Sequence, residues 1–145
     1  MTIDPAPFLG PIAVTVAYTA LYYWFQIRIL LVKRRLDAEY RARGERLDRY
    51  FNEDRVLLAA DRTQLNMLEH MPVFLSLLWV NAVFVSPLEA TIAGGIYVAA
   101  RAAYPFVMGP RLGRGVKGPI FLSTAPGYAV MLFLMVRPLV AALLA

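Results

Sequence analysis

The chain has 145 residues, of which 59% are hydrophobic and only 17% are charged, with a formal net charge of +5. A soluble domain of this size needs more polar surface than these residues supply, so the composition excludes an ordinary cytosolic globule and a disordered chain. Cysteine is absent and His70 is the single histidine. Disulfides, a thiol nucleophile and multi-histidine zinc or haem sites are therefore excluded, and we expect no metal centre.

Four apolar stretches follow one another along the chain. The first, residues 8–32, is apolar except for Gln26 and Arg28, and it is long enough to cross a hydrocarbon core about 30 Å thick. No basic residue precedes it and no small-residue cleavage site follows, so we interpret it as a retained transmembrane helix. The others are residues 56–85, 88–108 and 119–143, separated by turn signals. The pattern predicts an all-α membrane protein with one domain, residues 1–145.

The charged residues lie between alternate stretches. Residues 33–55 contain eight Lys/Arg and six Asp/Glu, and we expect helical patterning through much of this segment, broken near Gly44. The loop before the last stretch adds Arg111, Arg114 and Lys117. The positive-inside rule places both basic loops in the cytoplasm and both termini outside, in a bacterial inner membrane or the endoplasmic reticulum. Topology and contact with anionic lipid headgroups account for most of this charge. The interspersed acids argue against nucleic acid as a partner.

Two polar stripes interrupt the apolar pattern. The second stretch carries residues spaced by four and three, so that they share one helical face: Arg62, Asn66 and Glu69. The third stretch carries a stripe with the same spacing: Tyr97, Arg101 and Tyr104. Ionisable groups in a bilayer cost several kcal/mol when unpaired, so each stripe is expected to face a partner, a cavity or a ligand.

Two interpretations of these stripes remain open. One is an interhelical clamp, with Glu69 paired to Arg101 and Asn66 bonded across helices. The other is a site for a small zwitterion with two carboxylates and one amine, because arginine suits carboxylates and glutamate suits an ammonium group. A Ser-His-Asp triad at His70 is disfavoured, since no acid is positioned to orient the ring.

The run Arg62-Thr-Gln-Leu-Asn66-Met-Leu-Glu69-His-Met-Pro72 resembles the second helix of the MAPEG family, the membrane-associated proteins in eicosanoid and glutathione metabolism. In the next stretch, Gly94-Gly-Ile-Tyr97-Val-Ala-Ala-Arg101-Ala-Ala-Tyr104 resembles the family's third-helix motif. The two motifs have the expected separation, and the four-helix hydropathy covers the whole chain. The second-helix motif is typical of the family's branch of microsomal glutathione transferases and leukotriene synthases.

The resemblance implies a left-handed four-helix bundle that assembles as a homotrimer, with glutathione as co-substrate between subunits near the cytoplasmic face. The residues implied to bind glutathione are Arg62, Gln64, Asn66, Glu69, His70, Arg101, Tyr104 and a basic residue at the end of the first helix, taken as Arg34 from the run Lys33, Arg34 and Arg35. The family's thiolate-stabilising arginine should lie at the start of the fourth helix. Spacing does not choose between Arg114 and Lys117. We favour Arg114 because arginine keeps its charge when desolvated and glycines flank it.

The implied function is that of a glutathione transferase, with peroxidase activity as a variant, acting on lipophilic electrophiles or lipid hydroperoxides. The sequence departs from the family at His70 and Met108, where many transferases have tyrosine. A non-enzymatic lipid-binding or scaffold member of the family is therefore the alternative. A small transporter is a weaker one, because no inverted repeat is apparent.

Overall fold

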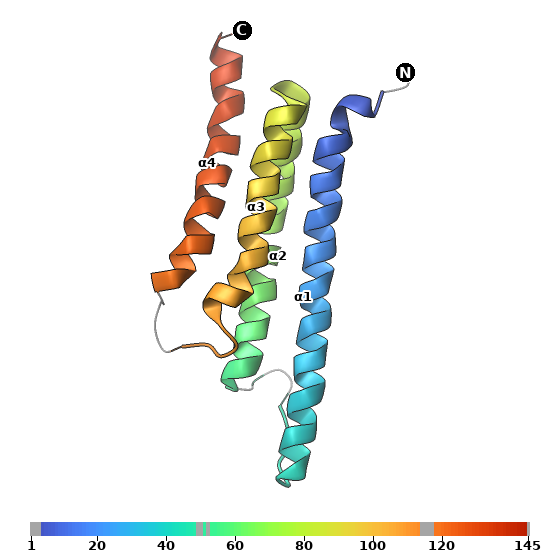
Figure 1. The fold of residues 1–145 in the computed structure, drawn as a ribbon, viewed down its shortest axis with the longest axis vertical. Helices are drawn as coiled ribbons and strands as arrows, with labels where there is room; N and C mark the ends of the chain where they lie inside the picture. The colour runs from blue at the N-terminus through green and yellow to red at the C-terminus, as the bar shows by residue number, and fades with distance from the viewer. Residues whose placement is uncertain (1–3, 49–50, 52, 114–117, 145) are drawn as a thin grey trace.

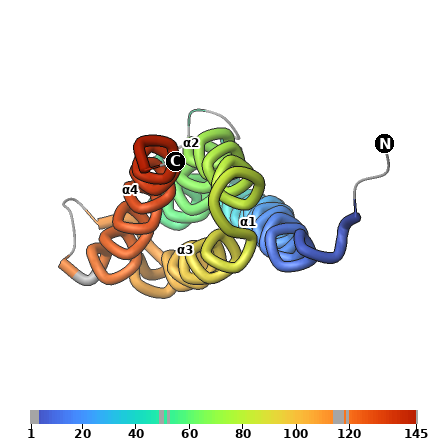
Figure 2. The backbone as a smooth tube through the Cα atoms, turned by 90° about the horizontal axis from the view of Figure 1, so that it is seen from above, coloured from blue at the N-terminus to red at the C-terminus, as the bar shows by residue number. Residues whose placement is uncertain are grey.

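The computed structural model describes residues 4–48, 51, 53–113 and 118–144. The elements in chain order are η1 (Ala6–Phe8), α1 (Leu9–Ala42), α2 (Arg55–Phe84), α3 (Pro87–Met108), η2 (Gly118–Ile120) and α4 (Phe121–Leu144). The long helices run up and down, so that both termini lie at one end and the α1–α2 and α3–α4 connections at the other (Figure 1). Seen from above, α2 and α3 lie between α1 and α4 (Figure 2). The predicted all-α, four-helix fold is confirmed.

The surface of the bundle suits a bilayer. Three segments are long and apolar enough to cross a membrane, namely Ala6–Ala42, α2 and α4. The 22 residues of α3 give it a length of about 33 Å, which also suffices, although its sequence is rich in alanine and glycine. Large apolar side chains are exposed along every helix, among them Trp24, Val80, Ile92 and Leu132. A continuous apolar surface of this kind is expected where lipid replaces water.

Local sequence fixes where three of the helices begin or end. The Asp54 carboxylate accepts hydrogen bonds from the first backbone N–H groups of α2, and the Ser86 hydroxyl accepts from the Glu89 N–H at the start of α3. The residues that end α1 and α3 are followed by glycines with positive φ, Gly44 at +75° and Gly109 at +82°. Only glycine adopts this conformation without strain, so these two positions stop the helices.

The first helix is longer than its apolar stretch. We predicted a membrane-spanning helix over residues 8–32 and helical patterning in much of the charged segment as far as Gly44, and the structure joins the two in one helix that ends at Ala42. Ion pairs at i,i+4 support the extension, Arg35 with Glu39 at 2.7 Å and Asp37 with Arg41 at 2.9 Å. The apolar pattern therefore marks the part of α1 that fits the bilayer, whereas the helix itself ends at the glycine.

The core is an aromatic cluster between α1, α2 and α3. Phe74 stacks on Tyr97 with ring centroids 4.1 Å apart, and Tyr18 packs on Phe74 at 5.0 Å. The Tyr18 hydroxyl donates a 2.6 Å hydrogen bond to the Met67 carbonyl oxygen, which satisfies the one polar group that this ring carries into the core. All three rings are fully buried.

Helices α2 and α4 are joined where a proline has left a carbonyl group without its helical partner. Pro138 has no N–H, so the Leu134 carbonyl four residues earlier cannot form its usual bond. The Asn81 side-chain amide donates to that oxygen at 2.6 Å and to the Leu77 carbonyl oxygen at 2.8 Å. Asn81 is fully buried, so the bond ties the two helices inside the bundle.

Candidate functional site

Arg101 lies at the point where α2, α3 and α4 meet, and it is only 1% exposed. Its Nη1 donates a hydrogen bond to Asn66 Oδ1 on α2, and its guanidinium carbon lies 4.8 Å from the centroid of the Tyr97 ring on α3. On α4, a Cβ atom added to Gly127 would lie 3.1 Å from Arg101 Nη2. One guanidinium group therefore contacts three helices, and the missing side chain at Gly127 makes room for it.

The bond across helices joins Arg101 to Asn66, not to Glu69. Among the described residues, no ion pair includes Arg62 or Glu69, and both side chains are exposed. The expected Glu69–Arg101 pair is thus absent there, because the amide of Asn66, one turn earlier on α2, bonds the guanidinium instead. Within the same residues, Arg101 Nε and Nη2 are buried without a hydrogen-bond partner. A buried cation with one neutral partner is an unusually incomplete arrangement.

Two more sequence-predicted residues lie beside this cluster. The Tyr104 side chain is within electrostatic range of Arg101, Arg62 and Glu69. The His70 side chain is within range of Arg101 and Glu69. The structure therefore brings six of the predicted residues together around Arg101, in the half of the bundle nearer the two connections: Arg62, Asn66, Glu69, His70, Arg101 and Tyr104.

The structure turns Gln64 away from this group. Its side chain is buried and donates a 3.1 Å hydrogen bond to the Tyr22 hydroxyl on α1. At about 100° per residue, Gln64 lies roughly 200° around α2 from Arg62, which explains the separation. Within a single chain, Gln64 thus joins α2 to α1, and its role in glutathione binding stays a prediction.

The predicted basic residues are placed less completely. Arg34 is exposed on the extension of α1, and no contact recorded for the described residues links it to the cluster. Arg114 and Lys117 lie outside the described residues. The loop just before them is held close to α2, because the Leu112 backbone N–H donates a 2.9 Å hydrogen bond to the Arg55 carbonyl oxygen.

Helix α4 contributes residues that sequence reasoning missed. The Tyr128 ring packs edge-on against the His70 ring, with centroids 5.5 Å apart. The Ser123 hydroxyl donates to the Ala100 carbonyl oxygen, one residue before Arg101, and Gly127 lies against the guanidinium. Ser123 and Gly127 are four residues apart and share a face. The sequence signal that could have identified this face of α4 is the spacing of two small residues in a helix of otherwise bulky side chains.

The chemistry of the cluster suits a charged organic ligand. An exposed carboxylate and an exposed guanidinium flank a buried cation, and a phenol and an imidazole lie beside them. Such a set can pair with both signs of a zwitterion. Across the described ranges, no group of three His, Cys, Asp or Glu side chains is arranged to hold a metal ion.

The sequence profile of the MAPEG family matches residues 11–140, a span that includes most of every helix. No curated protein sequence matches the chain. The profile covers far more than half of the chain, and three of the matched segments can cross a membrane. The protein is therefore an integral membrane protein and belongs to the MAPEG family.

Proposed function

We propose that this protein is a glutathione-dependent membrane enzyme. It activates the glutathione thiol as a thiolate and adds it to a lipophilic electrophile, or uses it to reduce a lipid hydroperoxide. The observation that supports this most is the pair of exposed, oppositely charged side chains, Arg62 and Glu69, beside the buried Arg101–Asn66 bond of an apolar bundle. Membership of a family concerned with glutathione and eicosanoids supports the choice of ligand.

The roles follow from the charges of glutathione, which carries two carboxylates and one ammonium group. Arg62 offers a planar fork of N–H donors to a carboxylate. Glu69 accepts from the ammonium group. Arg101 contributes a positive field from behind and positions Asn66 through their hydrogen bond. These interactions gain strength in an apolar bundle, where the effective dielectric is lower than in water.

The proposed assembly is a homotrimer whose binding site lies between subunits. In a single chain, Arg62 and Glu69 are exposed and too few helices surround a flexible charged tripeptide. A neighbouring copy closes the site and brings a basic residue from the end of its α1, for which Arg34 is the candidate. Native mass spectrometry in mild detergent should give trimers, whereas stable dimers or only monomers would contradict this assembly.

The cation that stabilises the glutathione thiolate is assigned to the loop before α4. A free thiol has a pKa of about 8.5, so it needs a nearby cation to ionise at neutral pH. We propose Arg114 for this role, with Lys117 as the competing residue. Thiolate absorbance in the ultraviolet should appear when glutathione is added to the wild type and decrease in Arg114→Ala. If only Lys117→Ala loses the signal, the role belongs to Lys117.

A conjugation assay tests the activity as a whole. Detergent-solubilised protein receives reduced glutathione and a chromophoric aryl halide, and reactions without glutathione or with Glu69→Gln serve as controls. We expect a glutathione-dependent rate above background that Glu69→Gln lowers. A folded wild-type protein that gives neither conjugation nor thiolate would favour the non-enzymatic lipid-binding alternative, which the Met108 departure supports.

The proposed orientation has both basic loops in the cytoplasm. Both connections lie at one end of the bundle (Figure 1), so one measurement determines on which side of the membrane both loops lie. Reporter fusions at the C-terminus should read as external because lysine and arginine are concentrated at the opposite end. A cytoplasmic signal would invert the orientation.

A further inference from the structure

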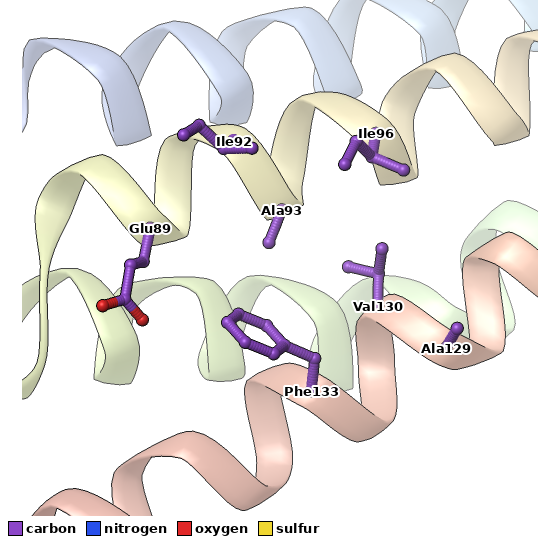
Figure 3. Close-up of a pocket in the computed structure, with 7 residues that line it drawn as sticks. All are labelled: Glu89, Ile92, Ala93, Ile96, Ala129, Val130 and Phe133. Carbon is purple, nitrogen blue, oxygen red and sulfur yellow. The ribbon is translucent and has the colours of Figure 1, made fainter.

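An apolar groove of about 350 Å³ lies between α3 and α4, at the end of the bundle that holds the termini. It is lined by Glu89, Ile92, Ala93, Ile96, Ala129, Val130 and Phe133. Figure 3 shows Val130 and Phe133 on α4 facing the row of apolar side chains on α3, with the Glu89 carboxylate at one end. The end of the groove at Glu89 is twelve residues, about 18 Å, from Arg101 along α3, and none of the lining residues belongs to the glutathione site proposed above.

The end of the groove at Glu89 carries both signs of charge. Arg137 on α4 donates two hydrogen bonds of 2.9 Å to the Glu89 carboxylate, from Nε to Oε2 and from Nη2 to Oε1. The two side chains remain 34% and 36% exposed. The pair uses two of the five guanidinium N–H groups, and each carboxylate oxygen keeps a lone pair. The intact ion pair can therefore still bind a second donor and a second acceptor.

We propose that this groove holds one acyl chain of a phosphatidylethanolamine molecule, with its headgroup on the Glu89–Arg137 pair. The lipid ammonium group donates to Glu89, and the lipid phosphate accepts from Arg137. A choline headgroup has no N–H to donate, and a glycerol headgroup brings no positive charge to Glu89. An acyl chain suits the apolar part of the groove, whose lining carries no polar side chain apart from Glu89 at one end.

The test compares lipids that differ only in their headgroups. Detergent-purified protein is titrated with phosphatidylethanolamine, phosphatidylcholine or phosphatidylglycerol of identical acyl chains, and bound lipid per chain is counted by native mass spectrometry. We expect phosphatidylethanolamine to bind about tenfold more tightly than phosphatidylcholine, as the loss of one charge-assisted hydrogen bond implies. Equal affinity for the two lipids would overturn the proposal.

Two variants separate the headgroup from the acyl chain. Glu89→Gln keeps an oxygen that can accept from Arg137 but removes the negative charge, so the preference for phosphatidylethanolamine should disappear. Ala129→Phe fills the groove from an exposed position and should lower the binding of phosphatidylethanolamine about tenfold or more. Its matched control is Ala99→Phe, an exposed alanine on α3 that does not line this groove.

Three results would contradict the proposal in these variants. Glu89→Gln could retain the full preference, or Ala129→Phe could bind lipid as the Ala99→Phe control does. Ala129→Phe could also change the number of chains in the assembly, which would make the groove an interface between copies. Circular dichroism and glutathione binding serve as checks, and both should match the wild type because the groove lies apart from the polar cluster.

Discussion

The two ends of the bundle differ in how their charged side chains are paired. Near the termini, Asn81 donates both of its amide hydrogens to carbonyl oxygens, and Glu89 and Arg137 form a two-bonded ion pair. Near the connections, Arg101 is buried with one neutral partner, and Arg62 and Glu69 are exposed without an ion pair among the described residues. The charged groups near the termini are therefore paired with each other, although Asn81 Oδ1 is buried there without a hydrogen-bond partner among the described residues. The charged groups near the connections have no ion-pair partner within the described part of the chain.

This difference supports the proposed function, in which the charges near the connections bind glutathione and those near the termini hold the fold. A charge in a bilayer is retained only where a partner offsets its desolvation. At the termini that partner belongs to the same chain, so the contact stabilises the bundle. At the connections the described residues supply no ion-pair partner, and the proposed function gives that place to glutathione and a second subunit. Local incompleteness of this kind is typical of functional sites.

The largest effect on glutathione affinity is expected for the charged side chains proposed to bind the ligand. Glu69→Gln and Arg62→Ala should each weaken glutathione binding about tenfold or more, because a charge-assisted contact contributes about 1.5–3 kcal/mol. Thermal unfolding should change little, since both side chains are exposed. Isothermal titration and thermal melts in the same detergent measure the two quantities. Failure of both variants to fold would assign the stripe to the interhelical clamp.

The opposite outcome is expected at Asn81. Asn81→Leu leaves the buried Leu134 carbonyl unsatisfied and should lower the free energy of unfolding by about 1–3 kcal/mol, with no change in glutathione affinity. Pro138→Ala restores the N–H that this carbonyl lacks, so the double variant should recover much of the loss. A double-mutant cycle followed by thermal unfolding measures the coupling. Purely additive losses would show that the Asn81 bond has another role.

A matched pair of glycines probes the packing of Arg101. Gly127→Ala places a methyl group 3.1 Å from Nη2, so it should cost about 1 kcal/mol of stability and shift the guanidinium enough to weaken glutathione binding a few-fold. Gly95→Ala points into open space and should stabilise α3 by about 0.5–1 kcal/mol. If both variants behave alike in melts and titrations, close packing at Gly127 is unimportant.

The smallest effect is expected outside the apolar part of the bundle. Glu39→Ala removes the exposed ion pair with Arg35 on the extension of α1. Exposed i,i+4 pairs contribute about 0.3–0.5 kcal/mol, and salt screens them. Thermal melts at low and high salt should therefore differ slightly for the wild type and less for the variant. A loss of several degrees at high salt would mean that this pair has a further partner.

Periodicity and composition predicted most of the fold, and helix spacing predicted the grouping of Asn66 with Arg101. Hydropathy marked only residues 8–32 of α1, whereas the break near Gly44 was predicted from the sequence and agrees with the end of the helix at Ala42. The continuity of α1 across residue 32, which ion pairs support, was not predicted. The orientation of Gln64 could have been deduced from its angle around α2.

The contributions of α4 could not have been deduced from the sequence. Whether Gly127 and Tyr128 meet Arg101 and His70 depends on how α4 is rotated against α2 and α3, which only the packed bundle determines. The same holds for Asn81. The sequence shows that Pro138 leaves the Leu134 carbonyl without its helical donor, but it does not show that the Asn81 amide replaces that donor.

The length of α1 has a mechanical consequence. Its 34 residues span about 51 Å, roughly 20 Å more than the hydrocarbon core of a bilayer. No glycine or proline interrupts the sequence between Pro11 and Gly44, so the helix has no built-in hinge. Transmembrane helices tilt when bilayer thickness changes, and a stiff rod that pivots in the membrane moves most at its protruding end. That end carries the buried Leu36, which lines one pocket together with Val56 on α2 and Arg111 before α4. A change in the tilt of α1 would therefore be transmitted to the start of α2 and to the loop before α4.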